Sequence, residues 1–184
     1  RVARNRGANP LTGLPGNLEI QTEMNSILAR NMKFAAIYAD LDNFKAYNDV
    51  YGFAKGDIAI KLTADILTDG IRDFGESEDF IGHIGGDDFL LITQPDKADQ
   101  ISQAVISRFD GRIRELYSEK DLEAGFISTC NSRGECIDYP IMTISLAIVT
   151  NEACDFSDHL QIAEAAAELK KKAKAISGSN FVRN

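Results

Sequence analysis

Residues 84–92, Ile-Gly-Gly-Asp-Asp-Phe-Leu-Leu-Ile, are the most informative segment of the chain. In it, two glycines and two acids interrupt an apolar run that would otherwise be read as one buried strand. Apolar segments on both sides of paired glycines are typical of two strands joined by a tight hairpin, with Gly85 and Gly86 forming the turn. The adjacent residues Asp87 and Asp88 follow directly after the glycines. An ordinary surface hairpin accounts for this stretch equally well, since turns favour these residue types.

The composition is that of one globular domain. Of the 184 residues, 44% are hydrophobic and 26% are charged, which is enough for a real core. We expect a single domain over residues 17–184 behind a linker segment over residues 1–16, and because the chain starts at Arg1 we expect it to be cut from a longer multidomain protein. The net charge of −8 argues against a broad nucleic-acid surface. Without a membrane-length apolar run or a signal peptide, we expect a cytoplasmic protein with no direct membrane insertion.

Alternation and helical spacing divide the chain into helices and strands. We expect Asn17 and Ser157 to cap the first and last helices. The order β-α-α-β-β-α-β, with two tight hairpins, predicts an α+β fold in which helices cover a central antiparallel sheet. The expected helices cover residues 17–30, 43–49, 56–67, 97–117 and 157–176, and the expected strands cover 34–39, 80–84, 89–92 and 141–149, with a further hairpin over 125–137.

A second acidic pair follows the first apolar strand. Strand alternation places Asp40 and Asp42 on one side of that strand. If the strand is a neighbour of the hairpin, these carboxylates meet Asp87 and Asp88. Like charges so close are costly unless a cation lies between them, so the convergence predicts a divalent metal such as Mg²⁺. Two metals about 3.5–4 Å apart, one at an attacking hydroxyl and one at a leaving phosphate, are the usual use of such a cluster in nucleotidyl transfer.

Two other uses of an Asp-x-Asp segment fit less well. A calcium loop of the EF-hand kind needs Gly at its sixth position and Glu at its twelfth, but the chain has Lys45 and Tyr51 there. Metal-dependent glycosyltransferases also carry Asp-x-Asp, yet the hairpin acids and the lack of a doubly wound pattern weigh against them.

Polar residues on the following helices are suited to a nucleotide. The carboxylate of Asp57 can accept from guanine N1–H and the 2-amino group, and the amide of Asn48 can pair with the purine edge. Adenine offers no such pair of donors. Read alone, both would be helix-surface or capping residues. The backbone amides of residues 43–45, which open a helix, are suited to phosphate, and Lys45 adds a positive charge.

Three cysteines are too few, and odd in number, for a disulfide scaffold. Cys130 and Cys136 can face each other across the hairpin expected at residues 125–137. However, no Cys-x-x-Cys spacing or nearby histidine supports a functional disulfide or a metal pair. We therefore expect a reduced setting for these two thiols and for Cys154.

Together these residues resemble the GGDEF domain of bacterial diguanylate cyclases over nearly the whole chain. The resemblance implies a palm-like nucleotidyl cyclase fold that converts two GTP molecules into cyclic di-GMP. The matching segments are residues 9–15, 40–52, 56–57, 85–89 with one change, and 173–174, which are similar to the family's D-x-L-T-G-L, D-x-D-x-F-K-x-x-N-D-x-x-G, G-D, G-G-D-E-F and A-K motifs.

The resemblance also implies a role for each matching residue. Because one domain holds one GTP, it implies a homodimer, arranged by an N-terminal sensor or receiver domain. The metal ligands would be Asp40, the Leu41 carbonyl and Asp87, which would hold two Mg²⁺ ions, or Mn²⁺ in their place. The residues that serve catalysis would be Asp87, Asp88 and Lys45. Guanine would be recognised by Asn48 and Asp57, and the phosphates would be bound by Phe44, Lys45 and Lys174.

Four positions depart from the family pattern: one shortens the reach to the metal, and the other three lose phosphate or other site contacts. Asp88 is one methylene shorter than the usual Glu. A basic residue, a His and an Arg are replaced by His83, Phe53 and Ser179. Two interpretations follow. The one we favour is a diguanylate cyclase, and the alternative is a catalytically degenerate domain that binds GTP or a protein partner as a regulatory module.

Overall fold

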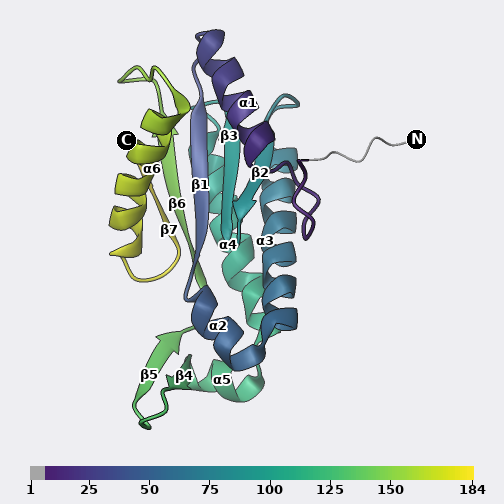
Figure 1. The fold of residues 1–184 in the computed structure, drawn as a ribbon, viewed down its shortest axis with the longest axis vertical. Coiled ribbons are helices and arrows are strands. Elements are labelled where there is room, and N and C mark those ends of the chain that lie inside the picture. Colours follow the sequence, from purple (N-terminus) through teal and green to yellow (C-terminus); the bar gives the residue numbers. More distant parts are fainter. Residues whose placement is uncertain (1–6) are drawn as a thin grey trace, which may run out of the picture.

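The computed structural model describes residues 7–184, so the first six residues of the expected linker lie outside the described range. Helices pack on both faces of a large central sheet (Figure 1). The helices are α1 (Asn17–Ala29), α2 (Phe44–Tyr51), α3 (Phe53–Phe74), α4 (Ala98–Arg112), α5 (Glu119–Ala124) and α6 (His159–Lys174), with a 3₁₀ turn over Ile113–Leu116. The strands are β1 (Ala35–Asp42), β2 (Phe80–Gly85), β3 (Asp88–Thr93), β4 (Phe126–Cys130), β5 (Cys136–Pro140), β6 (Thr143–Thr150) and β7 (Asn180–Arg183).

Five strands form the central sheet in the order β2-β3-β1-β6-β7. The first four pair antiparallel with their neighbours, which confirms the predicted α+β fold. The hairpin predicted from residues 84–92 is present, and Gly85 and Gly86 both have positive φ, 153° and 51°. The strand β7 is not among the expected strands; it has four residues and pairs in parallel with β6.

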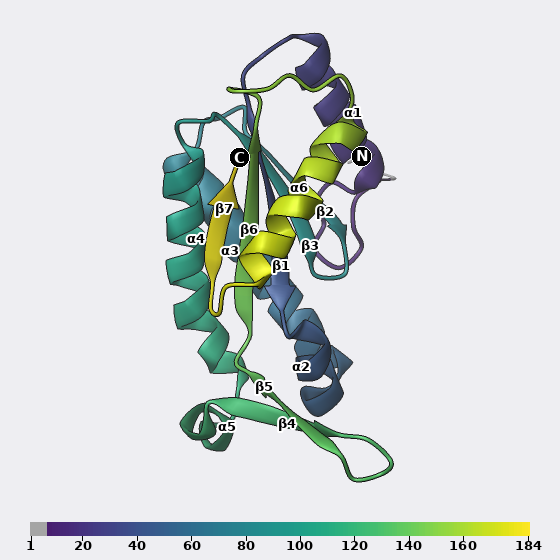
Figure 2. The same cartoon turned by 90° about the vertical axis from the view of Figure 1, so that its left-hand side faces the viewer.

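Strand alternation assigns each residue of β1 to one of two apolar cores. Ile37 and Leu41 belong to the core that contains residues of α3 and α4. Ala36 and Tyr38 belong to the core that contains residues of α1 and α6, the two helices that lie on the same face in Figure 2. By the same alternation, the even-numbered Asp40 belongs to the face that α6 covers.

Three tyrosines fix α2 to the segment that follows α4. The rings of Tyr47 and Tyr51 stack with centroids 4.7 Å apart, and Tyr117 meets both rings edge-on. The Tyr47 hydroxyl donates to the Leu116 carbonyl at 2.6 Å, and the Tyr117 hydroxyl accepts from the Met142 amide at 2.9 Å. Because the rings are packed and their polar ends are hydrogen-bonded, α2 has a defined position relative to the sheet.

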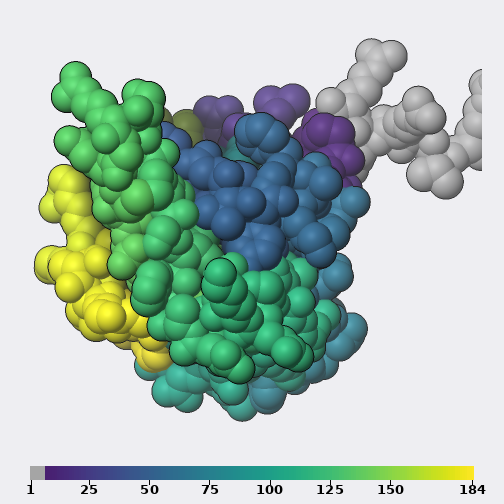
Figure 3. Space-filling view, turned by 90° about the horizontal axis from the view of Figure 1, so that it is seen from below, coloured from purple at the N-terminus to yellow at the C-terminus, as the bar shows by residue number. Residues whose placement is uncertain are grey.

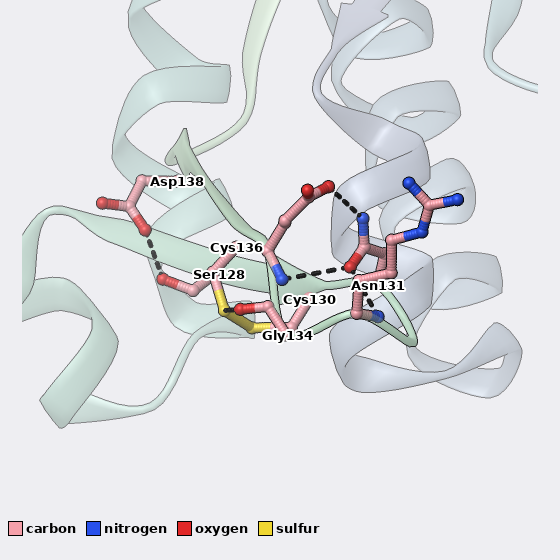
Figure 4. Close-up of a disulfide and its surroundings, with 8 residues drawn as sticks. Ser128, Cys130, Asn131, Gly134, Cys136 and Asp138 are labelled. Atoms are coloured by element: carbon pink, nitrogen blue, oxygen red, sulfur yellow. Dashed lines mark hydrogen bonds between the residues drawn. A yellow bond between two sulfur atoms is a disulfide. The ribbon is translucent and has the colours of Figure 1, made fainter.

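A small second sheet projects beyond α2. The hairpin of β4 and β5 lies beside α2 on the underside of the molecule (Figure 3). Cys130 and Cys136 occupy paired positions in this hairpin and form a disulfide (Figure 4), so the expectation that they stay reduced is wrong. Strand register, and not Cys-x-x-Cys spacing, brings the two side chains together. Cys154 is free and exposed.

The two expected helix caps are each displaced by one residue. Gly16 is the N-cap of α1, and the Asn17 side chain instead donates to the Ile84 carbonyl at 3.1 Å. Asp158, and not Ser157, caps α6 through its carboxylate. Among residues 7–184, no helix combines the length and the apolar character needed to cross a membrane.

Candidate functional site

Three carboxylates converge where β1 meets the hairpin of β2 and β3. Asp40 and Asp88 are cross-strand partners in the antiparallel pair, and Asp87 lies in the turn just before β3. One oxygen from each carboxylate lies within 4.8 Å of the others, and all three residues are half-buried. The pairing of β1 with β3 therefore brings together acids that are far apart in the sequence.

This convergence is electrostatically costly in the protein alone. Burial and the adjacent Asp40 carboxylate raise the pKa of Asp87 to about 7. The same two causes raise the pKa of Asp88. Such shifts mean that the cluster favours any added positive charge. Oxygen donors of this kind and spacing fit a hard divalent cation such as Mg²⁺, which would offset the repulsion.

Two lysines of α6 reach the cluster. Nζ of Lys174 lies 3.1 Å from an oxygen of Asp40 and 2.8 Å from an oxygen of Asp42. Nζ of Lys170 lies 3.4 Å from an oxygen of Asp88 and 3.8 Å from one of Asp40. Burial lowers the pKa of Lys174, but its contacts with Asp42 and Asp40 outweigh burial and raise it. Both ammonium groups therefore act as counter-ions to the acids.

The expected set of functional residues omits Lys170 and gives Asp42 no separate role. Lys170 precedes Lys174 by four residues, a spacing that puts both on one helix face and that is visible in the sequence. The Asp42 carboxylate accepts hydrogen bonds from the hydroxyls of Thr143 at 2.6 Å and Ser145 at 2.9 Å. Asp42 thus holds Lys174 against the sheet and does not belong to the three-carboxylate cluster.

A hollow of about 460 Å³ lies beside the cluster. Leu41, Phe44, Lys45 and Lys174 line it together with the three acids. The helix α2 begins here, after Asn43 turns the chain with a φ of 67°. Because the first amides of a helix have no partner within that helix, this rim of the hollow is suited to an anion such as phosphate.

The two residues expected to read guanine lie near the junction of α2 and α3. Within the described part of the chain, Asn48 Oδ1 is buried and has no hydrogen-bond partner. It lies against Gly56, where an added Cβ would be 1.7 Å from that oxygen. Asp57 is the next residue and is exposed, and neither Asn48 nor Asp57 lines the hollow beside the acids. A buried carbonyl oxygen without a partner costs about 1–3 kcal/mol, so a ligand that donates to it would gain affinity.

His83 has a structural role that its place in the family pattern does not suggest. It is 2% exposed and stacks on Phe89 with ring centroids 4.3 Å apart. Its Nε2 donates to the Gly86 carbonyl at 2.8 Å, and its Nδ1 bonds to the Thr12 hydroxyl at 2.9 Å. His83 therefore supports the turn that carries Asp87 and ties this turn to the N-terminal segment.

The other two replaced positions, Ser179 and Phe53, do not line the hollow beside the acids. The Ser179 hydroxyl donates to the Asp110 carboxylate and accepts from the Ile144 amide at 3.0 Å. Phe53, at the start of α3, is 81% exposed. Ser179 therefore fastens the segment before β7, whereas Phe53 makes no comparable contribution to packing.

The raised pKa of Asp87 predicts how the stability of the metal-free protein depends on pH. Its folded-state pKa of about 7 lies above the ordinary value of 3.8, so between these values the folded protein keeps a proton that the unfolded chain has lost. The free energy of unfolding should therefore fall as pH rises from about 4 to about 7, and Mg²⁺ should restore it at the upper end. Scanning calorimetry with and without Mg²⁺ measures both effects. Asp87→Asn should remove this part of the pH dependence, and equal slopes in the two proteins would contradict the assignment.

The helix-covered antiparallel sheet and the three carboxylates beside its β2–β3 hairpin define an α+β domain with a candidate divalent-cation site. The family model described as diguanylate cyclase, GGDEF domain, matches residues 8–130, more than half of the chain, and the chain belongs to this family. It is 29% identical over 168 residues to diguanylate cyclase DgcP of Escherichia coli (strain K12), a match that covers 89% of this chain and 44% of the relative. The chain thus spans less than half the length of that relative.

Solved structures share the fold. The chain matches diguanylate cyclase SiaD of Pseudomonas aeruginosa, solved in complex with its activator SiaC, with a TM-score of 0.73 and 19% identity over 98% of this chain and 63% of SiaD. It matches the GGDEF domain of DgcB from Caulobacter crescentus, solved in complex with c-di-GMP, with a TM-score of 0.67 and 17% identity over 100% of this chain and 98% of that domain. At these identities the likeness shows the common architecture.

Proposed function

We propose that this chain is the catalytic domain of a diguanylate cyclase, which joins two GTP molecules into cyclic di-GMP and releases pyrophosphate twice. The main observation behind the proposal is the convergence of Asp40, Asp87 and Asp88 beside a hollow that is also lined by the start of α2. Family membership and the relatives named diguanylate cyclase support the same reaction. We place the domain in the bacterial cytoplasm, within a longer signalling protein.

The acidic cluster would hold the metal cofactor. Asp40, Asp87 and the backbone carbonyl of Leu41 would bind Mg²⁺, two ions when GTP is present, with Mn²⁺ as a substitute, and Asp88 would support them. When bound, the ions favour ionisation of the attacking 3′-hydroxyl and offset the charge on the leaving phosphate. The protein's own part is to hold the carboxylates at a fixed spacing, which the pairing of Asp40 with Asp88 provides.

The nucleotide would lie along the start of α2. The amides of Phe44 and Lys45 would donate to phosphate oxygens, and the ammonium groups of Lys45 and Lys174 would neutralise phosphate charge. Lys45 also serves catalysis, because positive charge near the reacting phosphate stabilises the transition state. Asn48 and Asp57 would read guanine. The buried Oδ1 of Asn48, which has no hydrogen-bond partner among residues 7–184, would be a specific point of contact.

The reaction requires two copies of the domain. In the product each nucleotide has been attacked by the 3′-hydroxyl of the other, so two GTP-loaded hollows must face each other. We propose a homodimer whose arrangement is set by an N-terminal sensor or receiver domain in the full protein. No nucleic acid or direct membrane contact is needed for this function.

The decisive experiment uses a forced dimer of the chain, made by fusing a parallel coiled coil to its N-terminus. Incubation with GTP and Mg²⁺ should give cyclic di-GMP and pyrophosphate, detected by chromatography and mass spectrometry. Binding of GTP without product would favour a regulatory module, and absence of both binding and product would overturn the proposal.

We expect Asp88→Glu to increase turnover. The side chain of Asp88 is one methylene shorter than the family's Glu, and errors of about an ångström in a reacting group can cost on the order of a hundredfold in rate. The initial rate of cyclic di-GMP formation by the forced dimer should rise by about tenfold. The same lengthening at the exposed Asp65 of α3 serves as a control and should change nothing. If the rate stays equal or falls in Asp88→Glu, the length of the Asp88 side chain does not limit turnover.

A further inference from the structure

Lys170 differs from Lys171, the residue that follows it on α6. Its ammonium group lies between two carboxylates, 3.4 Å from Asp88 and 3.8 Å from Asp40, and its side chain is 23% exposed. The next residue, Lys171, has a side chain that is 76% exposed and contacts Glu168 on its own helix. Its neighbour Leu169 is part of the core between α6 and the sheet, so this turn of α6 packs against the sheet.

The two ammonium groups of α6 neutralise the cluster unevenly. Lys170 reaches Asp88 and Asp40, and Lys174 reaches Asp40 and Asp42. In the described part of the chain, no salt bridge reaches Asp87. The gap between Asp40 and Asp88 therefore already contains a positive charge, whereas the Asp87 side of the cluster does not.

We propose that Lys170 is a tethered counter-ion that takes the place of one cation, so that the nucleotide-free protein binds a single divalent ion, on the Asp87 side. This inference rests on the proposed function, because it concerns the metal site of that function. When all are ionised, the three acids of the cluster and Asp42 carry four negative charges, and Lys170 and Lys174 carry two positive charges. One divalent cation balances the remaining two negative charges. A second divalent ion would enter only with the charge of the GTP phosphates, and Lys170 would have to leave the gap between Asp40 and Asp88.

The test counts metal ions without any enzymatic reaction. The purified chain is freed of metal with a chelator and titrated with Mn²⁺ alone, and the free ion is followed by electron paramagnetic resonance. Wild type should bind about one Mn²⁺ per chain. Lys170→Met keeps the unbranched side chain to within one atom of its length but removes its charge. This variant should bind a second Mn²⁺ or bind the first about tenfold more tightly, as expected for removing a like charge a few ångströms away. Lys170→Arg keeps the charge and should resemble wild type.

Lys171→Met is the matched control, because it removes the same charge one position along the helix from a side chain that does not reach the cluster. Two Mn²⁺ ions in wild type, with no change in Lys170→Met, would overturn the role of Lys170 while leaving the proposed function intact. An equal gain in both methionine variants would reduce the effect to overall charge and would also overturn it. No Mn²⁺ binding by any variant, with GTP present or absent, would overturn the proposed function together with this inference.

Discussion

Asp87→Asn is expected to abolish cyclic di-GMP formation and at the same time to stabilise the metal-free protein. The amide keeps the shape of the side chain but is a poor metal ligand, and a bound metal supplies several kcal/mol of transition-state stabilisation, so turnover should fall by roughly a thousandfold. The ionised Asp87 is destabilising near neutral pH, because burial and Asp40 raise its pKa to about 7. Removing that charge should increase the free energy of unfolding at pH 8 by about 1 kcal/mol, after allowance for solvent screening.

Because turnover should fall while the free energy of unfolding should rise, the variant distinguishes a loss of catalysis from a loss of folding. Turnover is measured with the forced dimer, and stability by urea unfolding of the chain in the presence of a chelator. Asp65→Asn, at an exposed position of α3, is the matched control and should alter neither quantity. If Asp87→Asn lowers stability in the absence of metal, the repulsion inferred for this cluster is wrong. If it retains activity, Asp87 is not a metal ligand.

Gly56→Ala is expected to weaken GTP binding by about ten- to hundredfold, because a misplaced polar partner costs roughly 1–3 kcal/mol. The new methyl group would lie 1.7 Å from Asn48 Oδ1 and 2.8 Å from its Cγ, so the amide must move. Asn48 is the residue that we propose reads guanine, and its buried oxygen has no other partner in the described chain. Metal binding should be unchanged, because Gly56 is not among the residues that line the acidic hollow.

Calorimetric titration with a non-cleavable GTP analogue and Mg²⁺ measures the first effect, and Mn²⁺ titration of the nucleotide-free protein measures the second. Gly111→Ala in α4 is a matched control, because an added Cβ there has no heavy atom within 4 Å. It should leave binding unchanged and stabilise the fold by roughly 0.5–1 kcal/mol, since Gly is a poorer helix former than Ala. Wild-type affinity for the analogue in Gly56→Ala would remove Asn48 from the guanine site.

Local sequence patterns predicted the elements that have strong local signals. The hairpin at residues 84–92 follows from paired glycines in backbone conformations that other residues avoid, and β1 follows from its apolar run. The short elements α5 and β7 have six and four residues, too few for a hydrophobic period to stand out. The Cys130–Cys136 disulfide was missed for a different reason, because the register of β4 and β5 sets it and no spacing motif reports that register.

Strand alternation is a local property, and it is enough to predict the face of β1 on which Asp40 and Asp42 lie. Alternation puts Asp40 and Asp42 on one face of β1, and the paired glycines Gly85 and Gly86 place Asp87 in the hairpin turn. The folded chain alone reveals that β3 pairs with β1 in a register that opposes Asp40 to Asp88, and that α6 packs on this face. Lys170 meets Asp88 across 82 positions of sequence. The physical reason is that such contacts depend on strand register and on the packing of a whole helix, which local propensities do not encode.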